Sequence, residues 1–185
     1  MVRTDGVVSS WGRIVCWLEN NAPVTARALN QPAGDAEIRT LNNALGFPVP
    51  AELESWLRRN NGSADAGLFP GAEVFLDCAR IADRYRNHRR IAEDIGDADW
   101  WLPSWIPVLA VADAHYGLLL DAGRSESGAP APVLAFRETD HAGVHAPSLG
   151  HVLTAVADVL EQGGGAGALT RGRNPFVRDG RLDWN

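Results

Sequence analysis

The spacing of apolar residues changes near Trp105, and this change constrains the fold more than any other feature of the sequence. Before it, apolar residues recur at helical spacing, which predicts helices at about 10–20, 36–45, 51–60 and 78–95 and leaves room for a short strand at 73–76. After it, short apolar runs predict strands at 106–112, 116–121 and 133–136, and helical spacing returns at 149–161. Helices followed by antiparallel strands and a closing helix are typical of the α+β class.

Polar residues and glycines mark the ends of these helices. Gly46 is placed to end the second helix in the left-handed conformation, and Pro50 fixes the first turn of the third. The residues expected to cap helix N-termini are Ser9 or Ser10, Asp35, Asp77 and Ser148.

Composition limits the class of protein further. The 185 residues, 45% of them hydrophobic, are enough for one core. Cys16 and Cys78 lie far apart and have no close-spaced partners, which indicates reduced thiols rather than a disulfide framework. No signal peptide and no apolar run of membrane-spanning length is visible, so we expect a cytoplasmic protein that does not enter a membrane.

Charge narrows the possible partners. The net charge of −6 argues against direct nucleic-acid binding, which relies on neutralising phosphates, and favours basic or neutral protein partners. All 17 basic residues are arginine. The chain therefore has no lysine for a Schiff base or for a phosphate-binding loop.

Residues that could carry chemistry do not form a recognisable motif. His141 and His145 have helical spacing, but they lack the glutamate of a zincin motif and flank Gly143, so we expect solvated imidazoles on a loop or strand edge. Asp113 and His115 could pair as a base, but no nucleophile lies at a recognisable spacing. We therefore expect no catalytic residue, metal ion or cofactor. A pocket built from distant residues would escape this search, which keeps a small enzyme open as a further alternative.

The sequence suggests a boundary near residue 162. The glycine-rich run at 163–167 predicts a flexible linker, and the arginine-bearing segment after it has few apolar residues. We therefore expect one domain at 1–162 and a flexible tail at 163–185.

One segment has the character of a binding surface. An arginine-rich helix is followed at once by carboxylates and two tryptophans, and the candidate protein-binding residues are Glu93, Asp94, Asp97, Asp99, Trp100 and Trp101. Tryptophans beside acidic groups can form the anchor and rim of a site for a basic partner. Alternatively, the arginines form a solvated face and the tryptophans fill the core beneath a loop. If the segment is extended, adjacent side chains face opposite ways, so one tryptophan points inward and the other outward.

The order of several short motifs resembles the SMI1/KNR4 (SUKH) family. The first half contributes LGFPVP at 45–50 with its helix to Asn61-Gly62, and then Leu68-Phe69-Pro70. The second half contributes WIPVLA at 105–110, GLLLD at 117–121, PVLAF at 132–136 and the helix from Ser148. The resemblance covers about residues 11–161, although this chain has Asp113-Ala-His-Tyr-Gly117 where the family usually turns through glycines.

This resemblance implies a mostly antiparallel sheet, six-stranded or similar, flanked by helices in one domain. It also implies an intracellular protein-binding module without catalytic activity. Bacterial members are similar to immunity proteins that neutralise nuclease or deaminase toxins, which would make the partner a basic toxin domain. Fungal relatives resemble regulatory scaffolds in cell-wall signalling, and this remains the alternative. The motifs identify the fold rather than the partner or the oligomeric state.

Overall fold

The structure is a computed structural model, and it describes residues 5–64, 67–71, 73–111, 116–124, 129–137, 140–164, 167–170 and 172–185. The α-helices are α1 (Asp5–Asn21), α2 (Pro23–Arg27), α3 (Asp35–Leu45), α4 (Ala51–Leu57), α5 (Cys78–Asp94) and α6 (Leu149–Gln162). The strands are β1 (Glu73–Phe75), β2 (Trp105–Val111), β3 (Gly117–Asp121), β4 (Val133–Arg137), β5 (Asp140–Ala146), β6 (Pro175–Arg178) and β7 (Arg181–Trp184). Short 3-10 turns are η1 (Ala122–Arg124) and η2 (Ala168–Thr170). The predicted α+β class is confirmed.

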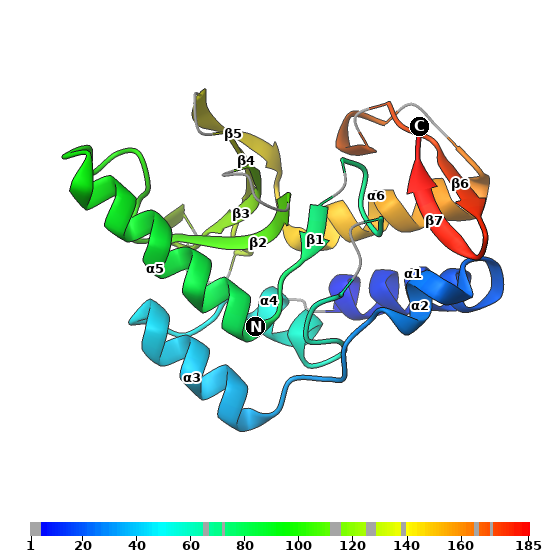
Figure 1. Ribbon diagram of the computed structural model, residues 1–185, viewed down its shortest axis with the longest axis horizontal. Helices are drawn as coiled ribbons and strands as arrows, with labels where there is room; N and C mark the ends of the chain where they lie inside the picture. The colour runs from blue at the N-terminus through cyan, green and yellow to red at the C-terminus, as the bar shows by residue number, and fades with distance from the viewer. Residues whose placement is uncertain are drawn as a thin grey trace.

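The main sheet is an antiparallel meander in which β1 to β5 follow one another in chain order. Phe75 of β1 lies opposite Leu109 of β2, and Leu119 of β3 lies opposite Leu134 of β4. The register shifts between Pro107 and Leu109, where proline supplies no N–H to the ladder. Helix α5 runs beside this sheet, and α3 lies against α5 on the side away from the strands (Figure 1).

Aromatic side chains fill the centre of the main core. Trp56 of α4 stacks on Phe75 with ring centroids 3.7 Å apart and contacts Trp11 of α1 edge to face at 5.3 Å. The indole of Trp11 also donates to Asn60 Oδ1 at 2.9 Å. These contacts tie α1, α4 and β1 together, so the apolar stripe expected on the first helix is buried as predicted.

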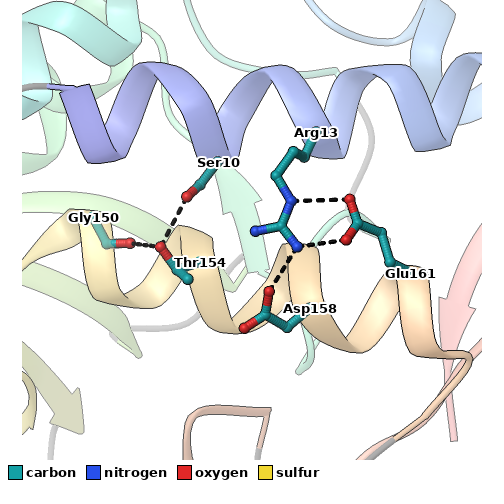
Figure 2. A network of polar contacts seen from close by, with 6 residues as sticks. All are labelled: Ser10, Arg13, Gly150, Thr154, Asp158 and Glu161. Carbon is teal, nitrogen blue, oxygen red and sulfur yellow. Dashed lines mark hydrogen bonds and ion pairs between the residues drawn. The ribbon is translucent and has the colours of Figure 1, made fainter.

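Helices α1 and α6 lie side by side and are joined by polar contacts along their exposed seam (Figure 2). Arg13 Nε donates to Glu161 Oε1 at 2.9 Å, and Arg13 Nη2 donates to Asp158 Oδ1 at 2.6 Å. These hydrogen bonds raise the pKa of Arg13, and the bond from Arg13 lowers the pKa of Glu161. One turn along, the hydroxyls of Ser10 and Thr154 lie 2.8 Å apart. The first and the last α-helix are therefore fastened to each other.

The C-terminal segment differs from the flexible tail expected from the sequence. Strands β6 and β7 form a hairpin beside α2 (Figure 1), and Leu182 and Trp184 belong to the main buried core. The N–H of Leu182 donates to Thr25 Oγ1 at 2.9 Å, and Trp184 Nε1 donates to Gly67 O at 3.1 Å. The expectation was wrong for residues 175–184 because two apolar residues on one face of a short strand are enough to bury it. The glycine run begins as the left-handed cap of α6 at Gly163.

Several helix ends are confirmed and one is corrected. Asp77 and Ser148 cap α5 and α6 as predicted, and Gly46 ends α3 with a φ of 81°. Asp35, however, is the first helical residue of α3, and the cap position belongs to Gly34. Helix α1 starts at Asp5, before the serines that were expected to cap it.

Candidate protein-binding surface

Helix α5 carries the charged segment identified in the sequence, with arginines along its length and carboxylates at its end. Asp77 caps it by accepting from the N–H of Arg80 at 2.7 Å. Helix α5 ends at Asp94, and two residues later Gly96 has a φ of 69°. This left-handed conformation suits glycine and turns the chain away from the helix axis. The arginines therefore lie within α5, and the carboxylates Glu93, Asp94, Asp97 and Asp99 lie at its end and just beyond it.

The arginines of α5 are engaged within the protein. Arg80 pairs with Asp77 at 2.7 Å, and Arg86 pairs with Asp83. Arg89 Nη1 donates to the carbonyl of Trp101 at 3.0 Å and so holds the connection that follows the helix. These arginines therefore also stabilise the fold, in addition to forming the solvated face that the sequence suggested.

The acidic end of α5 consists of Glu93, Asp94, Asp97 and Asp99, and all of them are exposed. Glu93 lies 3.9 Å from Arg89, at the limit of an ion pair. The other three form no ion pair with any residue that the structure describes. The C-terminal end of a helix dipole is itself negative and adds to the charge of these carboxylates, while Arg89 and Arg90 in the preceding turn offset part of it.

The two tryptophans lie beneath and beside this acidic end. Trp101 is 1% exposed, whereas Trp100 is partly buried. Both rings contact Phe136, with centroids 5.0 Å away for Trp101 and 5.3 Å for Trp100, and both contact His88. This second cluster is separate from the main core.

The prediction that these tryptophans face opposite ways assumed an extended segment, and that assumption was wrong. Residues 98–100 form a turn, in which Asp97 Oδ1 accepts from the N–H groups of Asp99 and Trp100 at 3.0 and 3.2 Å. The turn brings both rings to the same cluster. Trp101 is therefore structural, and Trp100 is the aromatic residue of the pair that keeps part of its surface available.

Sequence reasoning missed a cavity of about 570 Å³ at the opposite end of α5. The residues that line it come from the link before α3, from α3 itself, from the loop after α4 and from the start of α5. Its best-buried polar side chain is Asn61, which is 8% exposed. Asn61 Oδ1 accepts from the N–H of Cys78 at 2.8 Å, and its Nδ2 donates to Glu37 Oε1 at 2.6 Å. Burial raises the pKa of the Cys78 thiol to about 12, so it is neutral.

The remaining candidates do not assemble into a chemical site. Asp113 and His115 lie outside the described residues, as does the side chain of His141, although residues 140–146 form a strand. In the part of the chain that the structure describes, no three histidine, cysteine or acidic side chains are grouped to hold a metal ion. Among the same residues, no helix has the length and apolar character needed to cross a membrane.

The chain matches a known protein family. The model of the SMI1 / KNR4 family (SUKH-1) matches residues 32–155, which include α3 to β5, the acidic end of α5 and the lining of the cavity at its start except for Asn30 and Gln31. A search of curated proteins found no relative of this chain.

Proposed function

We propose that this chain, which belongs to the SMI1 / KNR4 family (SUKH-1), works by binding another protein rather than by catalysing a reaction. More specifically, we propose that it is an immunity-type protein that neutralises a cognate toxin of the nuclease or deaminase class. The partner would be a basic toxin domain. The chain would act in the cytoplasm, where such a toxin meets its substrate.

The observation that carries this proposal is the imbalance of charge along α5. Arg80 and Arg86 pair with carboxylates, Arg84 and Arg89 donate to backbone carbonyls, and Arg90 donates to the side chain of Asn87. Asp94, Asp97 and Asp99 have no ion pair among the described residues. Exposed charges of one sign speed the encounter with an oppositely charged partner more than they hold the complex together. A toxin that acts on nucleic acid carries a basic surface for its substrate, and an acidic protein can compete for that surface.

The aromatic cluster beside the acidic end adds an apolar contact, which holds a complex together after charge has brought the partners into contact. Trp100 packs edge to face on Phe136 and is fixed by the turn at Asp97, so it is ordered before any partner arrives. Ile95, at the C-cap of α5, is 55% exposed. A partly exposed, pre-ordered tryptophan ringed by polar groups is the arrangement in which single residues contribute most to binding.

The alternative of a regulatory scaffold rested partly on a flexible arginine-bearing tail. Because residues 175–184 pack as a hairpin on the domain, that feature no longer favours a scaffold over an immunity protein.

The test is to capture the partner of the chain from its native cytosol, to co-express the two proteins and to measure growth. We expect the chain to protect cells. The Asp97→Asn/Asp99→Asn variant should associate with the partner several-fold more slowly than the parent chain, and its association rate should depend less on salt. Asparagine keeps the oxygen that accepts from Trp100, so the turn is preserved. The matched control is Glu19→Gln/Asp179→Asn, which changes the net charge equally at exposed positions away from α5. Equal effects of the two variants would contradict a role for this surface.

A further inference from the structure

We propose that the cavity between α3 and the start of α5 binds a guanidinium group, supplied by an arginine side chain that projects from the protein partner. This inference rests on the proposed function, because it assumes that the partner is a protein. It adds a second contact to that function, which the acidic end of α5 does not provide. We call this the α3–α5 cavity, and its defining side chains are Gln31, Ala36, Glu37, Thr40, Asn61 and Asp77.

The cavity is built rather than incidental. Its floor is Asn61, which is 8% exposed and whose backbone N–H donates to Gln31 O at 2.9 Å. Asn30 Nδ2 donates to Asn61 O at 2.7 Å from the same link. Asn60 Nδ2 donates back to Asn30 O at 2.8 Å. This network fixes the link before α3 to the loop after α4, so the cavity exists before a ligand arrives.

The start of α5 does not offer its usual anion site here. Two of the N–H groups that an anion would use are already taken, since that of Cys78 donates to Asn61 and that of Arg80 donates to Asp77. Two carboxylates, Glu37 and Asp77, also line the cavity and would repel an anion. The site therefore selects against phosphates and carboxylates.

The lining instead has more acceptors than donors. Each oxygen of Glu37 accepts one bond, from Asn61 and from the N–H of Gly34, and both donors are uncharged. A carboxylate has about four lone-pair positions, so acceptor capacity remains. Arg80 offsets the charge of Asp77, and Arg58 is paired with Asp35 and Glu54. Of the two carboxylates that line the cavity, Glu37 is therefore the one that has no arginine as an ion-pair partner among the described residues.

A guanidinium group complements this lining better than other cations do. It is planar, carries five N–H donors and no acceptor, and so matches carboxylate oxygens held in fixed positions. Pro32, Ala36 and Ala79 supply apolar contact for the alkyl stem of an arginine. Gln31, Pro32, Ala36, Glu37 and Thr40 are exposed, so the cavity opens to solvent. Its volume of about 570 Å³ exceeds what a lone ammonium group would fill.

The cavity and the acidic end lie at opposite ends of α5. The helix has 17 residues, and at a rise of about 1.5 Å per residue it is roughly 25 Å long. One partner surface of ordinary size can cover that distance. A single partner is therefore large enough to reach both contacts.

The experiment titrates the labelled full chain with Nα-acetyl-arginine amide, which mimics an arginine residue, and follows backbone amide shifts by NMR. We expect saturable, millimolar binding with shifts at Gln31, Glu37, Asn61 and Ala79. The citrulline analogue has the same shape without the charge and should bind at least about tenfold more weakly, because charged hydrogen bonds are about twice as strong as neutral ones. Free arginine should bind no better than the blocked form.

Two variants locate the binding. Glu37→Gln should weaken binding about tenfold, whereas Glu19→Gln on α1 should leave it unchanged. Because Glu37 also holds Asn61, a second variant, Ala36→Leu, fills the cavity without touching that bond, and Asn43→Leu on the exposed face of α3 is its control. Ala36→Leu should abolish the shifts and Asn43→Leu should not.

The inference is overturned if the blocked arginine causes no shifts, if citrulline binds equally well, or if Ala36→Leu leaves binding intact. Tighter binding of free arginine than of the blocked form would make the cavity a small-molecule site and refute the protein partner as its source. These results are independent of growth protection by the chain, so the inference and the proposed function fail separately.

Discussion

The C-terminal hairpin gives the sharpest test of the fold, through the substitution Trp184→Ala. Trp184 is 6% exposed, lies in the main core and donates its indole N–H to Gly67 O. Truncating a buried tryptophan costs about 3–5 kcal/mol, because apolar contacts are lost and a cavity remains. Total stabilities are about 5–15 kcal/mol, so this loss is a large part of the whole. For a chain of this size it corresponds to a fall in Tm of roughly 6–20 °C.

The assay is urea unfolding followed by circular dichroism, which does not depend on the fluorescence of the residue that is removed. The control is Val177→Ala in the same hairpin, where the side chain is 41% exposed and the expected loss is within about 0.5 kcal/mol. If Trp184→Ala costs no more than Val177→Ala, residues 175–184 do not pack on the domain and the flexible tail must be reinstated.

Three further predictions concern single side chains. Trp101→Ala should cost about 3–5 kcal/mol in unfolding experiments and Trp100→Ala clearly less, because only Trp101 is fully enclosed; equal losses would contradict this assignment. Burial raises the pKa of Glu52 above its ordinary value of 4.5, against the hydrogen bonds from Gly150 and Leu149 that lower it. The folded state then binds the proton more tightly than the unfolded state, so Glu52 destabilises the fold increasingly as pH rises above about 4.5. The stability of Glu52→Gln relative to the parent should therefore increase across that range, and a constant difference would refute the argument. Finally, a thiol reagent should modify exposed Cys16 in the native chain and reach buried Cys78 only after denaturation, as mass spectrometry can show.

The parts of the fold that the sequence predicted are set by interactions within one or two helical turns. Asp77 and Ser148 were identified as caps because a cap needs only its own side chain and the next few N–H groups. Gly46 was identified because few other residues accept a positive φ. In the same way, the exposure of the acidic end followed from charge alone.

The parts that were missed depend on contacts between distant segments. Burial of Trp184 requires Gly67 and the core beside α2, and nothing near residue 184 indicates either. In an extended chain, adjacent side chains would point in opposite directions. The turn at Asp97 changes these directions, so that both tryptophan rings contact Phe136. The α3–α5 cavity joins positions from Asn30 to Ala79, so no local pattern could have shown it.

The central claim is that the chain neutralises a toxin by binding it, and one measurement tests this directly. The partner that the chain captures from its native cytosol is assayed for nuclease or deaminase activity on nucleic acid while the purified chain is added in increasing amounts. The account predicts that activity falls in proportion to the added chain and is lost at an equimolar ratio. Full toxin activity in the presence of excess chain would contradict it.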